Sequence, residues 1–275
     1  MSDEVKDIVR TAVEELINET MSPRQISKHF AVHEAKLHFV PVRYRVLQGL
    51  LQSLSIKFGN FIEKLIALVV ERDTCVDELP ASGKKIRLLT NPRTDTLIDE
   101  YITARQQPNS PDQCDTEFQT LLNTIFQIES QSSDEEKNSV TRDVDALFKT
   151  QDGEIVYLEI KYNDDHDTGK FVDINRKFLK TYAGLIGYLE ITDISMFTPI
   201  LYYLNPTKRY GPIYTPSSNI YRGNQLFEHY FEIKYSDIDF YLRTIGEDPE
   251  VLALFDEAYK AVRYTHKRSN SMFNP

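Results

Sequence analysis

The spacing of apolar residues along much of this chain predicts α-helices. Apolar side chains recur every three or four positions, which places them on one face of a helix. Residues 3–20 show this spacing clearly, and Ser22-Pro23 then offers a cap and a first-turn proline for the next helix. Residues 73–93 follow no period and are expected to be irregular. Helices are predicted over residues 3–20, 23–30, 43–72, 94–106, 118–128 and 172–189, and from Pro249 onward.

Residues 143–161 show a different spacing, in which apolar and polar residues alternate. A period of two predicts two β-strands, each with one apolar face. The sequence Gln-Asp-Gly at residues 151–153 suits a three-residue hairpin loop with Gly153 in the left-handed conformation. Residues 196–204 are apolar almost throughout, so this third strand is expected in the interior of the same sheet.

The predicted register brings charged side chains together on one face of the hairpin. It pairs Asp145 with Glu159, and Asp143 with Lys161. Two carboxylates directly opposite each other repel, so a divalent cation such as Mg²⁺, which prefers oxygen ligands, is a natural partner. With Lys161 beside them to hold or activate water, these groups suit metal-dependent hydrolysis of a phosphodiester. An ordinary hairpin with one solvated, mixed-charge face fits the same residues.

Basic residues after the hairpin are candidates for contact with phosphates. The stretch 205–225 is basic, aromatic and rich in turn residues, as in functional loops, although an ordinary long loop has the same composition. Asp164, Asp165, His166 and Asp167 lack the spacing of a calcium loop, and a metal site, base contacts and a solvated loop are all open there. The basic candidates are Lys170, Arg176, Lys177 and Lys180 before and within the predicted 172–189 helix, and Lys208, Arg209 and Arg222 in the later stretch.

Composition limits the classes of protein to which the chain can belong. It has 275 residues, 41% of them hydrophobic, which is enough for one large domain or two small ones. The net charge of −10 gives no globally basic surface, although a local basic cleft can still bind nucleic acid. Two cysteines provide neither a disulfide framework nor a zinc site, which favours the cytoplasm. The charged N-terminal stretch is not expected to be a signal peptide, and no membrane span is expected.

The order of the predicted elements is more specific than any one of them. A helix with a central acid is followed by an Asp-bearing strand, a tight turn, a Glu-x-Lys strand and a basic helix. This order resembles the PD-(D/E)xK nuclease superfamily. Residues 36–66 and 144–185 resemble type II restriction endonucleases of the HinfI and TdeIII kind, and together they cover about a quarter of the chain.

The resemblance implies roles for the charged residues of the hairpin. Asp145 and Glu159 would bind Mg²⁺, and Lys161 would serve the attacking water. Glu63, on a helix face of small residues, would be a fourth member of the catalytic group, although an ordinary surface glutamate fits that position equally well. The chain departs from the motif in one respect, because Val rather than Pro precedes Asp145 and Asp143 is a competing ligand two residues upstream. We prefer Asp145 because the predicted turn places it opposite Glu159.

The resemblance also implies a fold and a reaction. We expect an α/β, restriction-endonuclease-like mixed central sheet flanked by helices, with an N-terminal helical region. The chain would be a single nuclease domain that cuts double-stranded DNA at a short, interrupted palindrome as a homodimer and leaves 5′-phosphate ends. A repair or structure-selective nuclease and a catalytically silent DNA-binding module are the alternatives. Within that domain we expect a helical region that contributes to the dimer at 1–72, a catalytic core at 73–265 and a flexible tail at 266–275.

Overall fold

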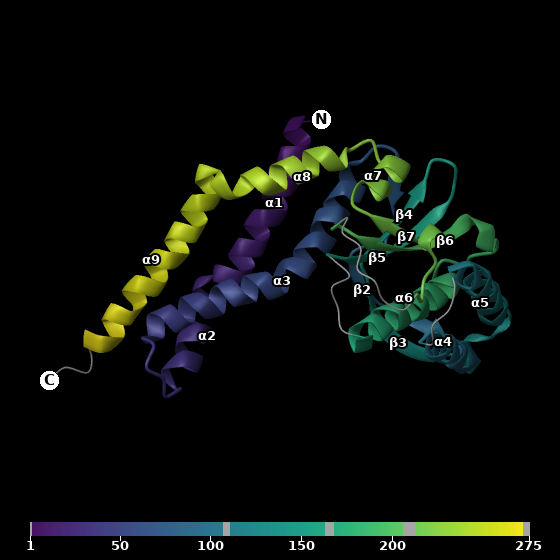
Figure 1. The fold of residues 1–275 in the computed structure, drawn as a ribbon, viewed down its shortest axis with the longest axis horizontal. Helices are drawn as coiled ribbons and strands as arrows, with labels where there is room; N and C mark the ends of the chain where they lie inside the picture. Colours follow the sequence, from purple (N-terminus) through teal and green to yellow (C-terminus); the bar gives the residue numbers. More distant parts are fainter. Residues whose placement is uncertain (1, 107–110, 163–167, 206–212, 272–275) are drawn as a thin grey trace. The chain divides into compact units, whose positions relative to one another are not determined.

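The computed structural model of the protein describes residues 2–106, 111–162, 168–205 and 213–271. The chain divides into two compact units. Residues 66–235 form an α/β unit, while residues up to 65 and from 236 onward form a helical unit. The strands of the described residues all lie in the α/β unit (Figure 1).

A mixed five-stranded sheet forms the centre of the α/β unit (Figure 1). Its strands, in spatial order, are β1 (Val76–Glu78), β4 (Ala146–Thr150), β5 (Ile155–Lys161), β6 (Phe197–Tyr203) and β7 (Ile220–Arg222). The pairs β1–β4 and β4–β5 are antiparallel, whereas β5–β6 and β6–β7 are parallel. This sheet confirms the predicted fold class. It also confirms that residues 196–204 contain an interior strand, since β6 has a neighbour on each side.

A second, two-stranded sheet overturns one prediction. Residues 73–93, expected to be irregular, contain β1 and also β2 (Lys84–Thr90), which pairs antiparallel with β3 (Asn138–Val144). The charged start of β2 conceals its strand character, because only Leu88 and Thr90 of this strand are buried. Its partner also lies about fifty residues further along the chain, so the pairing is a tertiary contact that local periodicity cannot reveal.

Helices of the α/β unit cover the sheet face that carries Tyr157. They include α4 (Pro92–Ala104), α5 (Pro111–Gln131) and α6 (Thr168–Tyr188), and a short α7 (Asn224–Tyr230) follows β7. The ring of Phe178 on α6 stacks on Tyr157, with 5.8 Å between centroids. Gly184 allows α6 to approach β2, because a Cβ at that position would lie only 2.8 Å from the Cβ of Leu88. The hairpin face with alternating charges is therefore buried beneath α6 and is not a solvated surface.

The helical unit has its own small core. It contains α1 (Ser2–Met21), α2 (Pro23–Glu34), most of α3 (Val42–Arg72), α8 (Tyr235–Thr244) and α9 (Pro249–Ser271). An ion pair of 2.7 Å joins Arg10 on α1 to Asp248, which precedes α9. The structure confirms the helices predicted here and extends α2 to Glu34 and α9 to Ser271, into the expected tail. One cluster of buried apolar side chains in this unit consists of Ile26, Phe30, Val46, Leu50 and Val262. Among the described residues, no helix has the length and apolar character needed to cross a membrane.

Candidate active site

The hairpin has the predicted loop and register. The backbone N–H of Thr150 donates to the carbonyl of Glu154 at 2.8 Å, which closes the three-residue loop. Gly153 has a φ of +92°, the left-handed conformation that glycine adopts without a steric cost. Further along, Ala146 pairs with Leu158, and counting one residue outward places Asp145 opposite Glu159.

One predicted pair is wrong, because the chain changes sheets at Asp145. Asp143 pairs with Lys85 of β2 and not with Lys161. Its carboxylate is largely exposed and lies 3.8 Å from the ammonium of Lys85. Asp145 lies between the end of β3 and the start of β4. This break directs the Asp145 side chain toward β5 and leaves Asp143 in the other sheet.

The side chains of Asp145 and Glu159 are fully buried and accept several hydrogen bonds. The backbone N–H of Ile160 donates to Oδ2 of Asp145 at 2.9 Å. The hydroxyl of Tyr157 donates to Oε2 of Glu159 at 2.9 Å. Buried carboxylates are costly unless they are hydrogen-bonded or paired, so this arrangement needs the cations beside it.

Two lysines supply the positive charge between these acids. The ammonium of Lys161 lies 2.7 Å from Glu159 and 3.3 Å from Asp145. The ammonium of Lys177, from α6, lies 2.8 Å from Glu159 and 3.1 Å from Asp145. Burial alone would lower the pKa of Lys177, but the charges of Glu159 and Asp145 raise it above its ordinary value on balance. The side chains of Lys161 and Lys177 are 20% and 32% exposed, so the cluster opens to solvent on the lysine side.

The sequence indicates that Lys177 belongs to a basic helix but does not place it in this cluster. The spacing nevertheless indicates that Lys177 lies on the buried side of the helix. It lies three residues after Ile174 and four before Thr181, and both of these residues are buried. A lysine on the buried side of a helix requires a carboxylate partner. Tyr157 is a second residue that the sequence argument missed, because its alternation with Val156 and Leu158 indicated only a strand.

The two acids fit a divalent cation. A single ammonium group already reaches Oδ1 of Asp145 and Oε1 of Glu159, so one positive centre can contact both carboxylates. Mg²⁺ commonly takes one or two protein carboxylates and completes its octahedron with water and substrate phosphate. Within the described residues, no group of three or more Asp, Glu, His or Cys side chains is placed to hold a metal ion.

Two other basic residues of α6 pair with acids on α4. Arg176 lies 2.8 Å from Asp99, and Lys180 lies 3.1 Å from Asp99 and 3.3 Å from Asp95. Burial would raise the pKa of Asp99, but hydrogen bonds and charges from Arg176 and Lys180 lower it on balance. In this structure both cations therefore join α4 to α6.

The other predicted residues are placed as follows. Lys170 is exposed near the start of α6. The guanidinium of Arg222 lies over the ring of Tyr203, 4.6 Å from its centroid. Glu63 is partly buried on α3 in the helical unit. Lys208, Arg209 and the loop Asp164, Asp165, His166 and Asp167 lie outside the described residues.

A mixed sheet with two carboxylates and a lysine on its central hairpin defines the class of restriction-endonuclease-like nucleases. Comparison with known proteins gives the family. The sequence profile of "Type II restriction endonuclease, HinfI" matches residues 1–246. The type II restriction enzyme HinfI of Haemophilus influenzae is 41% identical over 266 residues, which cover 95% of this chain and 98% of that protein. The chain thus belongs to the HinfI family of type II restriction endonucleases, site-specific deoxyribonucleases that generally use a divalent metal ion.

Proposed function

We propose that this enzyme hydrolyses double-stranded DNA at a short, interrupted palindrome and that Asp145, Glu159 and Lys161 form its catalytic centre. The observation that supports this most strongly is the convergence of the three side chains, with both carboxylates buried and 2.7 to 3.3 Å from the lysine. The same three residues have the order and spacing of the superfamily motif. Mg²⁺ is the proposed cofactor, held by Asp145 and Glu159.

The bound cation would polarise the phosphate and lower the pKa of a water molecule. Asp145 and Glu159 would orient that cation, and the backbone N–H of Ile160 holds Asp145 in place. Lys161 would hold the attacking water beside the phosphorus and help to remove its proton. A new bond then forms from the water oxygen to phosphorus, and the bond from phosphorus to the 3′ oxygen breaks. The leaving oxygen takes a proton and becomes a 3′-hydroxyl, and the product strand carries a 5′-phosphate.

The contacts of Tyr157 and Lys177 suggest supporting roles. Tyr157 is fully buried, and burial together with the charges of Glu159 and Asp145 raises its pKa well above the ordinary value. It therefore stays protonated and donates to Glu159, which fixes the orientation of that carboxylate. Lys177 would leave the acids when the cation binds and turn to a phosphate oxygen.

Residues outside the cluster would contact DNA or support the metal site. We propose Lys170, Lys208, Arg209 and Arg222 as DNA contacts, joined by Arg176 and Lys180 if their pairs with α4 open on binding. Glu63 would support the catalytic centre from α3. Its neighbours at four residues in either direction are Gly59 and Ala67, which leave room for the close approach of another element.

Two identical subunits related by a two-fold axis match the symmetry of a palindromic site most simply, so we propose a homodimer. The helical unit supports this, since large apolar side chains such as Leu37 and Phe39 are almost fully exposed there. We also propose a cytoplasmic location, because the two cysteines provide no disulfide framework.

Incubation of the protein with phage DNA and Mg²⁺ tests the proposal. We expect discrete bands, because cleavage at one repeated sequence gives fragments of fixed length. Asp145→Asn and Glu159→Gln should abolish the bands while the circular dichroism spectrum stays that of the wild type. A smear without bands would indicate a repair or structure-selective nuclease instead. Full activity in either variant would contradict the assigned metal ligands.

A further inference from the structure

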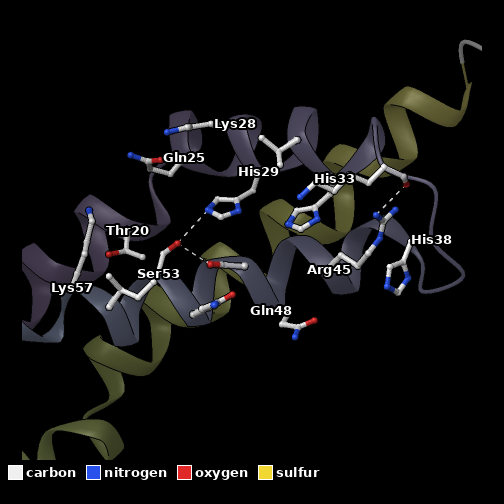
Figure 2. A pocket seen from close by; sticks show the side chains of 15 residues that line it. Thr20, Gln25, Lys28, His29, His33, His38, Arg45, Gln48, Ser53 and Lys57 are labelled. Atoms are coloured by element: carbon white, nitrogen blue, oxygen red, sulfur yellow. Dashed lines mark hydrogen bonds between the residues drawn. The ribbon is translucent and has the colours of Figure 1, made fainter. Parts of the chain in front are cut away.

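A groove in the helical unit lies between α2 and α3, with the end of α1 beside it (Figure 2). It encloses about 730 Å³. Figure 2 shows His29 and His33 on α2 directed toward α3, where His29 approaches Ser53. The described residues that line it include no Asp or Glu. Its cationic and imidazole side chains are Lys28, Lys36, Arg45, Lys57, His29, His33 and His38.

The charge of this segment is opposite to that of the whole chain. Residues 22–62 contain six Lys and Arg and one acid, Glu34, while the complete chain has a net charge of −10. Three of the six histidines also lie in this segment. A local positive surface on an acidic protein concentrates anions there.

Several polar groups in the groove lack the partners that burial normally requires. Arg45 is 7% exposed, and its guanidinium donates to the carbonyl oxygens of Val40 and Lys36. Within the described chain it has no carboxylate partner. The hydroxyl of Thr20, 2% exposed, and Nδ1 of His33 have no hydrogen-bond partner among the described residues. A buried cation without an anionic partner and buried polar atoms without a hydrogen-bond partner are costly. An anion with several acceptor oxygens would supply partners for them.

The histidine rings are held in place by the floor of the groove. His29 and His33 stack with 6.0 Å between centroids. Both lie against Gly49, where a Cβ would be 2.7 Å from Nδ1 of His29 and 3.1 Å from Nε2 of His33. The hydroxyl of Ser53 donates to the Gly49 carbonyl, and Nε2 of His29 lies 3.4 Å from that hydroxyl. Gly49 on α3 therefore makes room for the two imidazoles of α2.

We propose that this groove binds the phosphodiester backbone of duplex DNA as a second contact surface, separate from the catalytic centre. The inference rests on the proposed function, which makes DNA the substrate. Figure 2 shows Lys57 at one end of the groove and Arg45 and His38 at the other. Arg45 and Lys57 are twelve residues apart on α3, roughly 18 Å along a helix. Cations spread over that length match several successive phosphates, spaced about 3.4 Å per base along the duplex axis, better than one small anion.

The salt dependence of DNA binding tests the proposal in the full-length protein. Lys28→Gln with Lys36→Gln removes two charges from the groove, and Lys6→Gln with Lys260→Gln removes two exposed charges from the same unit outside it. Binding of a fluorescent 40-base-pair duplex is measured in EDTA over a range of salt concentrations. The groove variant should lower the slope of log affinity against log salt by about two and weaken binding about tenfold or more at moderate salt. The control should bind as the wild type does.

Other results would overturn the proposal. An unchanged slope in the groove variant would do so, because those lysines then contact no phosphate. Loss of inorganic-phosphate binding in the groove variant, with an unchanged slope for DNA, would also overturn the proposal and would identify a small-anion pocket. A change in sedimentation mass with an unchanged slope would identify a contact between copies of the chain. The slopes are measured in EDTA, where no cleavage takes place. Failure of the wild type to cut DNA would therefore contradict the proposed function and not the DNA contact of the groove.

The histidines provide an independent readout. Burial lowers the pKa of both His29 and His33, assisted by Lys28 for the first and by Lys36 and Arg45 for the second. The charges of His29 and His38 also lower the pKa of His33, so the neighbours that shift these two rings are all cationic or imidazole groups. A phosphate between them favours the protonated rings, so affinity should rise as the pH falls from 8 to 6. The variant His29→Gln with His33→Gln should lose most of this rise, and an identical pH dependence would contradict the placement of phosphate against these rings.

Discussion

At the residue scale, the contacts of Lys177 bear on what the proposed catalytic centre can hold. Its ammonium group and that of Lys161 both contact Oε1 of Glu159 and each contacts a different oxygen of Asp145, so two positive charges lie beside two buried carboxylates. A divalent cation between the same oxygens would repel both ammonium groups. Metal binding and the position of Lys177 are therefore coupled.

Lys177→Gln should tighten Mg²⁺ binding, because it removes a positive charge from the oxygens that the cation needs. One unit charge at 4 Å is worth about 1 to 4 kcal/mol across the range from water to a protein surface, so we expect on the order of tenfold tighter binding. Titration calorimetry of the DNA-free protein measures it. The control is Lys180→Gln, since Lys180 pairs with Asp95 and Asp99 on α4. Equal or weaker binding in the Lys177 variant would show that the ammonium does not compete with the metal.

At the element scale, the hairpin loop fixes which residues meet. Side chains alternate between faces, so a shift of one residue moves Asp145 away from Glu159. The structure shows the three-residue loop and the left-handed Gly153 on which this register depends. The loop therefore links a local turn to the geometry of the proposed catalytic centre.

Deletion of Gln151 should leave a folded but inactive protein. The remaining Asp-Gly pair is a favoured two-residue turn, so the hairpin can close, but in a register that separates Asp145 from Glu159. Gly153→Ala is the matched control. Its Cβ would lie 3.6 Å from Met196, an ordinary contact, so the cost is the backbone conformation, about 1 kcal/mol. Cleavage and thermal unfolding are measured for both; an active deletion variant with normal Mg²⁺ affinity would refute the register argument.

The pairing of α4 with α6 makes stability depend on pH. The pKa of Asp99 is lowered in the folded state, so its contribution is fully present above its unfolded pKa of about 3.9 and is lost as the pH falls through the lower folded value. Asp99→Asn should therefore lower the free energy of unfolding by about 0.5 to 1 kcal/mol at pH 7, a small value because the side chain is half exposed. The difference from the wild type should shrink below about pH 4.

Chemical denaturation between pH 3 and 7 measures that difference. Glu100→Gln, which changes the adjacent exposed carboxylate, is the control and should behave as the wild type does at each pH. A difference between Asp99→Asn and the wild type that stays constant over this range would show that the ion pairs with Arg176 and Lys180 contribute nothing to stability.

At the scale of the whole molecule, the palindromic target that we propose calls for two catalytic centres. Each chain has a mass of 32.0 kDa and one cluster of Asp145, Glu159 and Lys161. One centre cuts one strand, so cleavage of both strands in a single encounter requires a second subunit. The exposed apolar side chains of the helical unit are the surface that we expect to contribute to this association.

Sedimentation should give a mass near 64 kDa, twice that of one chain, at concentrations where the enzyme cuts DNA. On a supercoiled plasmid, both strands should be cut before the enzyme dissociates, so linear product appears without accumulation of the nicked circle. A monomeric mass at active concentrations, with nicked circle as the first product, would contradict the homodimer.

The sequence by itself determined the features that depend on neighbours along the chain. Helical spacing, the Gln-Asp-Gly loop and strand alternation are local, and together they were enough to place Asp145 opposite Glu159 and Lys161 on the same strand. Only the tertiary structure decided which distant segments meet. It paired β2 with β3, turned the chain between sheets at Asp145, and brought Lys177 from α6 onto both acids. These contacts arise from packing the sheet against α6, and local periodicity does not encode which segments share a core.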